Sequence, residues 1–212
     1  RTAYYFVASD HFYESLEILL DFVTHPYFTP ETVAKEQGII GQEIRMYDDS
    51  PAWRVMFNML MAMYHNHPVR IDIAGTVESI AKIDYNLLYD CYNTFYNPSN
   101  MFICIAGNVD ADACLKQIKS SIKPSEPHEI IRIKPEEPET VVKNYTEQAL
   151  EVAQPMFCFG FKENPSEEIS LKDKIITSLL LNIISGDASP LYKELINKGL
   201  INDEFENEHF CG

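Results

Sequence analysis

Two glutamates, Glu36 and Glu43, lie seven residues apart in a segment with the pattern of a helix, Glu31 to Tyr47. At about 100° per residue, seven steps return to within roughly 20° of the starting direction, so Glu36, Glu43 and Tyr47 follow one line of that helix. Apolar residues flank this line: Val33, Ile39, Ile40 and Ile44. The spacing therefore predicts two carboxylates turned inward on an apolar stripe.

A carboxylate in apolar surroundings needs a cation, because its desolvation is otherwise very unfavourable. One such glutamate favours an ion pair with a buried Arg or Lys. A second glutamate in register favours a metal ion, where one carboxylate binds the ion and the other orients the site. The spacing alone leaves the ion pair and the metal site about equally supported.

Four stretches of the chain carry a resemblance to a known family. They are residues 33–54, with the sequence VAKEQGIIGQEIRMYDDSPAWR, and residues 67–80, 92–110 and 189–200. Together they resemble the M16 (pitrilysin-like, inverzincin) zinc peptidases, and most closely the YmfH-type bacterial branch. In that family, two histidines of an H-x-x-E-H helix and a glutamate of a later helix bind the zinc. The resemblance implies that Glu43 is the third zinc ligand and that Glu36 is a catalytic residue supporting the site.

No H-x-x-E-H motif occurs in the sequence. His11 comes nearest, since Glu14 is in place but Ser15 stands where the second histidine belongs. The other histidines are His25, His65, His67, His128 and His209. We therefore expect an internal fragment that begins after the motif, with Zn²⁺ in the full-length parent and absent from this fragment. An inactive homologue, acting as a noncatalytic M16-like partner subunit or peptide-binding scaffold, is the alternative.

His65 and His67 could form a local metal pair on a strand, where alternate residues share one side. They follow the apolar helical run from Trp53 to Tyr64 and precede Pro68, which favours a solvated turn instead. We expect His11 to be exposed near the start of a helix.

Composition narrows the class of protein. The chain is 46% hydrophobic and 23% charged, and its formal net charge is −15. That charge argues against nucleic acid and anionic membranes as partners. The odd number of widely spaced cysteines favours reduced core thiols and a cytoplasmic location: Cys91, Cys104, Cys114, Cys158 and Cys211.

Proline spacing divides the chain. Four prolines and repeated glutamates predict a linker at 124–140. Residues 1–123 would then be the later part of a first M16 peptidase-like domain, and 141–212 the opening part of a second. The patterns predict strands at 4–8, 101–106, 154–161 and 202–210, and helices at 13–23, 30–47, 51–64, 84–95, 111–122, 166–184 and 190–198. The third helix is entered through Ser50 as N-cap and Pro51 as first residue.

The resemblance implies an α/β (α+β) fold, built from tandem domains that each carry a mainly antiparallel or mixed sheet with helices on one face. It also implies a zinc metalloendopeptidase acting on peptides or unfolded polypeptide. Incomplete sheets would expose edge strands and apolar surface. We therefore expect a homo- or hetero-oligomer with another M16-like subunit, and no nucleic-acid or membrane partner.

Overall fold

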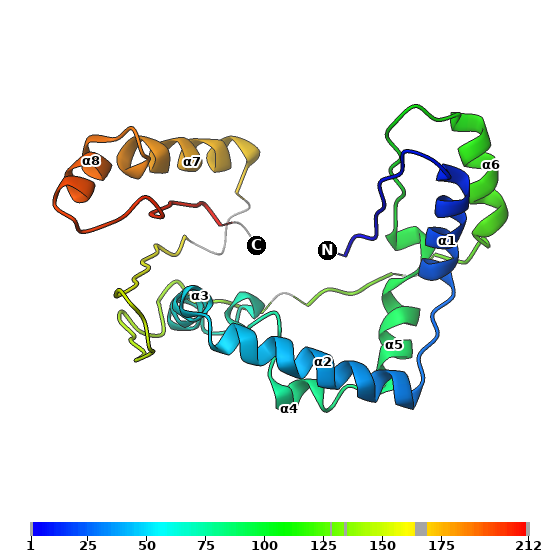
Figure 1. Cartoon of the computed structure of the whole chain (residues 1–212), viewed down its shortest axis with the longest axis horizontal. Coiled ribbons are helices and arrows are strands. Elements are labelled where there is room, and N and C mark those ends of the chain that lie inside the picture. The colour runs from blue at the N-terminus through cyan, green and yellow to red at the C-terminus, as the bar shows by residue number, and fades with distance from the viewer. Residues whose placement is uncertain (1, 128, 134, 164–168, 211–212) are drawn as a thin grey trace. The chain divides into compact units, whose positions relative to one another are not determined.

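The computed structural model describes residues 2–127, 129–133, 135–163 and 169–210. These residues form helices joined by irregular segments (Figure 1). They divide into two compact units, the first made of 1–54 and 72–134, the second of 55–71 and 135–212. The helix α3 (Pro51–Met63) begins in the first unit and continues in the second.

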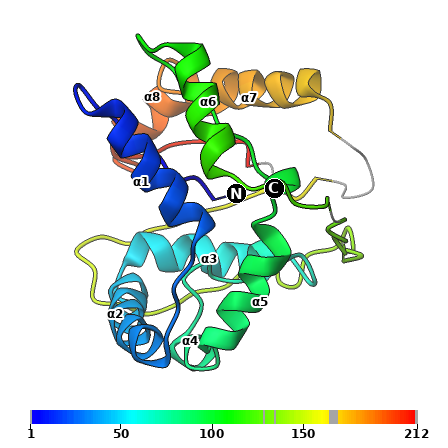
Figure 2. The ribbon, with the colours of Figure 1, turned by 90° about the vertical axis from the view of Figure 1, so that its right-hand side faces the viewer.

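The first unit contains α1 (Phe12–Thr24), α2 (Pro30–Asp48), α4 (Val77–Ile80), α5 (Tyr85–Phe95) and α6 (Ala111–Ser121), with a 3₁₀ turn at Pro98–Asn100. Helix α1 packs on α6 (Figure 2) and buries Leu16, Leu20 and Cys114. Helix α2 packs on α4. Thr29 and Thr32 form a capping box at the start of α2, where Pro30 fills the first turn.

The second unit contains most of α3, a 3₁₀ turn at Pro68–Arg70, α7 (Leu171–Ser185) and α8 (Pro190–Asn197). Phe57 and Leu60 of α3 are its buried apolar residues, and α7 packs on α8. The predicted helices therefore form close to their expected bounds. The predicted start of the 166–184 helix lies outside the described residues, and α7 begins at Leu171.

The predicted α/β (α+β) fold class is wrong for this structure, because the described part of the chain contains no β-strand. The segments 4–8, 101–106, 154–161 and 202–210 are not helical, yet none pairs with another in a hydrogen-bonded ladder. A β-propensity pattern becomes a strand only when a neighbouring strand accepts its backbone hydrogen bonds. In segment 154–161, side-chain contacts with a helix take the place of that pairing.

Segment 154–161 shows this clearly. Cys158 donates a hydrogen bond from Sγ to Sδ of Met59, 3.2 Å away, and Gly160 faces the sulfur atoms of Met59 and Met63. The alternate residues lie on the other side and are exposed: Phe157, Phe159 and Phe161. The segment keeps the two-faced alternation of a strand while one face lies on helix α3.

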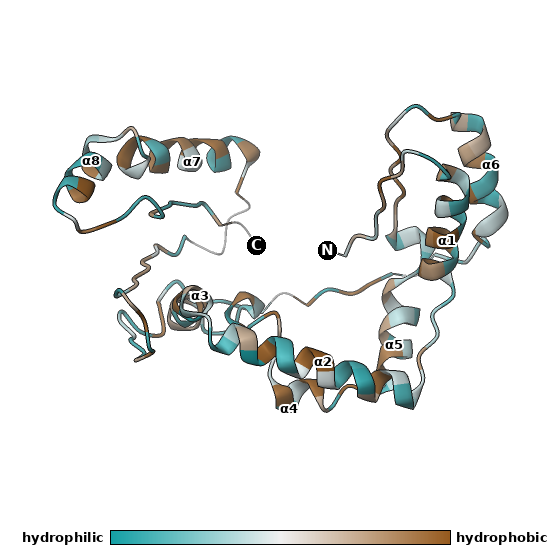
Figure 3. Cartoon of the chain, viewed as in Figure 1, coloured by the Kyte–Doolittle hydropathy of each residue, from teal (hydrophilic) through white to brown (hydrophobic). Residues whose placement is uncertain are grey.

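Helix α7 has a broad apolar face beside a polar stripe of Lys174, Ser178, Asn182 and Ser185, and Figure 3 shows brown bands alternating with teal and white ones along it, yet none of its residues is buried. Its exposed apolar residues are Leu171, Ile175, Ile176, Leu179, Leu180, Ile183 and Ile184. A broad apolar face is typical of a helix that packs against a core. The second unit therefore presents a large apolar surface.

The prediction of reduced core thiols has a mixed outcome. Cys91, Cys104, Cys114 and Cys158 are free thiols, as predicted, but only Cys114 among these four is buried, and Cys211 lies outside the described residues. Within the described ranges, no single helix is long and apolar enough to cross a membrane, although α7 and α8, bent at 40°, pass together by length and composition.

Candidate functional site

Helix α2 carries both predicted site residues, and both are exposed to solvent. The predicted helix is correct, but the prediction that Glu36 and Glu43 turn inward is wrong. The buried residues of α2 are Val33, Gly41 and Ile44. The exposure of the two glutamates does not test their predicted roles. Glu43 as metal ligand and Glu36 as supporting residue therefore stay predictions.

Helix α4 explains which face of α2 is buried. Gln37 donates hydrogen bonds from Nε2 to the carbonyl oxygens of Ile80 and Ile83, at 3.3 and 2.8 Å. Gly41 is buried next to this contact although it adds no hydropathy signal. The face of α2 that packs on α4 includes Gln37 and Gly41, which an apolar pattern does not mark as buried. The pattern therefore predicted a buried face that included the glutamates.

The carboxylate of Glu43 is held by a neighbour one turn later. The hydroxyl of Tyr47 donates a hydrogen bond of 2.8 Å to Oε1 of Glu43. This hydrogen bond, followed by the negative charge of Glu43, raises the pKa of Tyr47 above its usual value. The phenol therefore stays protonated and remains a donor, and Oε2 of the carboxylate is left for another partner.

The ring of Tyr47 stacks on Trp53, with centroids 4.4 Å apart and planes inclined by 19°. The indole Nε1 of Trp53 donates a 2.7 Å hydrogen bond to Oδ2 of Asp72. Sequence reasoning placed Tyr47 on the glutamate line but missed Trp53 and Asp72. No periodicity links residues that come from a helix start and a turn.

Zinc accepts carboxylate oxygens as ligands, usually with three protein ligands in a catalytic site. An exposed carboxylate with one oxygen already fixed fits the part of a single zinc ligand. The residues that the structure describes contain no group of three or more His, Cys, Asp or Glu side chains able to hold a metal ion. Glu43 thus fits the role of one ligand of a zinc site. The other ligands would have to come from outside the described residues.

In the described part of the chain, four histidines, His11, His25, His65 and His67, make their contacts with residues other than Glu36 and Glu43. His11 is exposed and occupies the N-cap of α1, as predicted. His65 and His67 lie in the bend after α3, where His67 accepts the backbone N–H of Val69. His25 lines a shallow pocket between α1 and α6.

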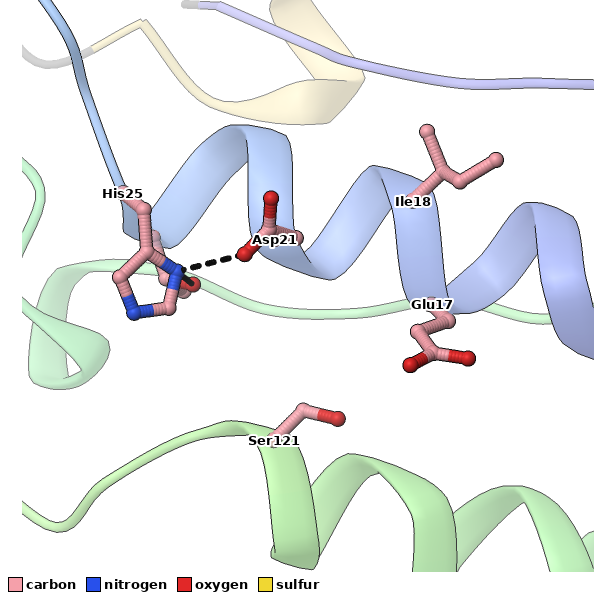
Figure 4. Close-up of a pocket in the computed structure, with 6 residues that line it drawn as sticks. Glu17, Ile18, Asp21, His25 and Ser121 are labelled. Carbon is pink, nitrogen blue, oxygen red and sulfur yellow. Dashed lines mark hydrogen bonds and ion pairs between the residues drawn. The ribbon is translucent and has the colours of Figure 1, made fainter.

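That pocket has a volume of 390 Å³ and is lined by Glu17, Ile18, Asp21, Thr24, His25 and Ser121. Its histidine lies 3.0 Å from the Asp21 carboxylate through Nδ1 (Figure 4). Both side chains are more than half exposed, so the pair contributes little to stability. Neither Glu36 nor Glu43 is among the residues that line this pocket.

A buried ionic cluster in the second unit was not foreseen. Glu137 accepts backbone hydrogen bonds from His65, Asn66 and His67, at 2.8, 2.6 and 2.7 Å. Lys162 lies 2.5 Å from the same carboxylate and also donates to the carbonyls of Pro138 and Thr140. One glutamate among several in a proline-rich stretch gives no sequence signal of burial.

Two family models match the chain. Residues 1–77 match the model described as Insulinase (Peptidase family M16), and residues 82–205 match the Peptidase M16 inactive domain. The chain therefore belongs to the M16 peptidase family. The predicted domain bounds 1–123, 124–140 and 141–212 stay a prediction, since the match ranges do not test them.

Individual M16 relatives match the chain over most of its length. The chain is 46% identical to the uncharacterized zinc protease YmfH of Bacillus subtilis over 97% of its own length and 49% of that protein. It is 29% identical to the uncharacterized zinc protease YmxG of the same organism. A crystal structure of an M16-like peptidase from Alicyclobacillus acidocaldarius aligns with TM-score 0.80 and 36% identity, over 93% of this chain and 48% of that one. The chain thus spans about half the length of these relatives.

Proposed function

We propose that this chain is the part of a zinc-dependent metalloendopeptidase that supplies one zinc ligand, the Glu43 carboxylate. One observation carries the proposal: in a chain of the M16 family, the Tyr47 hydroxyl fixes Oε1 of Glu43 and leaves Oε2 for a metal ion. A bound zinc ion lowers the pKa of its water towards neutrality and polarises a peptide carbonyl. The relatives' names as zinc proteases support this reaction class.

The chain's own residues would do three things in that reaction. Glu43 would bind the metal through the oxygen that Tyr47 does not hold. Glu36, two turns earlier on the same exposed line of α2, would orient the site without a required metal bond. Alone, the 212-residue chain would be inactive, because its described residues offer no complete metal site.

The proposed substrate is a peptide or unfolded polypeptide segment, and the proposed partner is another M16-like subunit. The exposed aromatic face of Phe157, Phe159 and Phe161 supports both, because an apolar strand-like segment is able to accept an extended chain. The net charge of −15 supports the expected absence of nucleic-acid and anionic-membrane partners. A cytoplasmic location remains part of the proposal.

A noncatalytic partner subunit or scaffold is the second candidate. It is favoured by the description of the model matching residues 82–205 as an inactive domain, and by the exposure of Glu36 and Glu43. A buried carboxylate would need a cation, whereas an exposed one is stable in water without any metal.

The gene sequence upstream of Arg1 separates the candidates first. An encoded H-x-x-E-H motif supports the peptidase, and its absence supports the scaffold. The extended protein is then purified as wild type, Glu43→Gln and the control Glu31→Gln, which changes an exposed glutamate in the first turn of α2. Metal content and chelator-sensitive cleavage of an unstructured peptide are measured.

We expect Glu43→Gln to weaken zinc binding by at least about tenfold. Even mutation of a residue that only hydrogen-bonds a metal ligand typically lowers metal affinity by about that factor. Glu31→Gln should match the wild type. Equal zinc content and cleavage in Glu43→Gln and wild type would rule out Glu43 as a ligand. Cleavage by the 212-residue chain alone would contradict its expected inactivity.

A further inference from the structure

We propose that Tyr47 is a positioning residue that fixes the Glu43 carboxylate in one orientation, and that Trp53 and Asp72 in turn fix the Tyr47 ring. The inference rests on the proposed role of Glu43 as a zinc ligand and deepens it. It assigns to three side chains the task of presenting one ligand in a constant direction.

The first step is the hydroxyl–carboxylate bond. Tyr47 lies four residues after Glu43 on α2, so the two side chains are neighbours on one helix face. An exposed glutamate otherwise samples several rotamers and loses that conformational entropy when a ligand immobilises it. The 2.8 Å bond from the Tyr47 hydroxyl to Oε1 restricts the carboxylate before any metal arrives. Oε2 is then presented in a defined direction.

The second step is the anchoring of the tyrosine. Its ring is half-buried and stacks on the indole of Trp53, the sole tryptophan of the chain. The indole N–H is bound to Oδ2 of Asp72, and Oδ1 of the same carboxylate accepts the backbone N–H of Ala74 at 3.0 Å. The orientation of Glu43 is therefore set by α2, by the first turn of α3 and by the turn at 72–74. A tyrosine held by its helix alone would lack the last two constraints.

The chain contains its own control for this arrangement. Tyr145 donates a hydrogen bond of 2.8 Å to Oε2 of Glu147, the same bond at the same length. Its ring is 74% exposed, and residue 145 lies outside any helix. Tyr145→Phe thus removes an equivalent hydroxyl–carboxylate bond from another part of the molecule.

The test measures the side-chain rotamers of Glu43 by NMR three-bond couplings in the metal-free 212-residue chain. The samples are wild type, Tyr47→Phe, Trp53→Phe and the control Tyr145→Phe. Helix content by circular dichroism checks that each variant folds. Tyr47→Phe keeps the ring and removes only the hydroxyl, so a loss of Glu43 order does not arise from lost stacking.

We expect one dominant Glu43 rotamer in wild type and Tyr145→Phe, averaged couplings in Tyr47→Phe, and intermediate averaging in Trp53→Phe, which lacks the N–H to Asp72. Averaged couplings in the wild type, or unchanged couplings in Tyr47→Phe, overturn the positioning role. Unchanged couplings in Trp53→Phe overturn the part played by Trp53 and Asp72.

A second experiment makes the same four variants in the upstream-extended protein described above, adds Zn²⁺ and follows the Glu43 side-chain resonances. We expect zinc to shift them with an affinity about tenfold weaker in Tyr47→Phe than in wild type, the scale typical of residues that orient a ligand. If Glu43 is rigid in wild type and mobile in Tyr47→Phe but zinc never shifts it, positioning stands and the proposed zinc role fails. If zinc shifts Glu43 equally in both, Tyr47 does not position it for the metal.

Discussion

The ammonium of Lys162 lies 2.5 Å from the carboxylate of Glu137, and the two side chains are only 2% and 3% exposed. Lys162 also lies over the ring of Tyr64, 5.0 Å from its centroid. The pair joins the bend after α3 to two segments far along the sequence. With three backbone N–H groups on the carboxylate, the buried charges are well satisfied.

Glu137→Gln should destabilise the second unit by about 3–5 kcal/mol, because it leaves the Lys162 charge buried without its counter-ion. The free energy of unfolding from urea titration measures the change. Glu194→Gln is the matched control, since its pair with Lys198 is 2.6 Å long but 60% exposed on both sides. We expect less than about 1 kcal/mol there. Equal losses in the two variants would contradict a dominant role for burial.

Acid should weaken the same unit. Burial alone would raise the pKa of Glu137, but the hydrogen bonds from Lys162 and the three backbone amides outweigh it and lower that pKa to about 2. A lowered folded-state pKa contributes stability that is present above the unfolded value of 4.5 and is lost as the pH falls towards 2. Urea titrations from pH 6 to about 2 should show this loss in wild type. If Glu137→Gln shows the same slope over that range, the acid loss comes from other carboxylates.

Alanine at the glycines of α2 should stabilise the first unit. An added Cβ at Gly38 or Gly41 meets nothing within 4 Å, and alanine is favoured over glycine inside a helix by about 1 kcal/mol. We expect Gly38→Ala and Gly41→Ala each to raise the free energy of unfolding by about 0.5–1 kcal/mol. Gly75→Ala is the contrasting variant, because φ is +73° and Ser79 Oγ lies 2.8 Å from the new Cβ. Destabilisation by Gly41→Ala would show that the contact with α4 closes further in solution.

The phenol of Tyr96 should lose its proton at a higher pH than an ordinary tyrosine. The hydrogen bond with Tyr4, 2.6 Å between the hydroxyls, and then burial raise the pKa of Tyr96 to about 12. We expect Tyr4→Phe to lower that pKa towards 10, measured as phenolate absorbance against a Tyr96→Phe reference. A raised pKa stabilises the fold below pH 10 and ceases to do so as the pH rises through about 12. Tyr27→Phe, at an 81% exposed position, should leave the Tyr96 titration unchanged.

The helices were predictable because each has local signals. Asp84, Asp110 and Ser189 accept backbone N–H groups at the starts of α5, α6 and α8, and such caps are visible in sequence. The absence of β-strands from the described residues was not predictable in this way, since strand pairing depends on a partner segment that local pattern does not reveal. The β-like alternation of 154–161 is present, but helix α3 covers one of its faces.

The candidate site was predicted in part. Spacing placed Glu36, Glu43 and Tyr47 on one line of a helix, and α2 is helical there. Spacing could not tell which side α4 covers, because the contact uses a glutamine side chain and a glycine. The contact between Trp53 and Asp72 depends on a turn whose conformation no residue pattern fixes. Local order was therefore accessible from sequence, whereas the direction of burial was not.

The sole tryptophan, Trp53 in the first turn of α3, lies against the ring of Tyr47, which holds Glu43, so all tryptophan emission comes from this one place. Fluorescence excited at wavelengths that tyrosine does not absorb is thus a label-free optical probe of this corner of the protein. Emission wavelength and lifetime would report cation binding or subunit docking there without any attached dye.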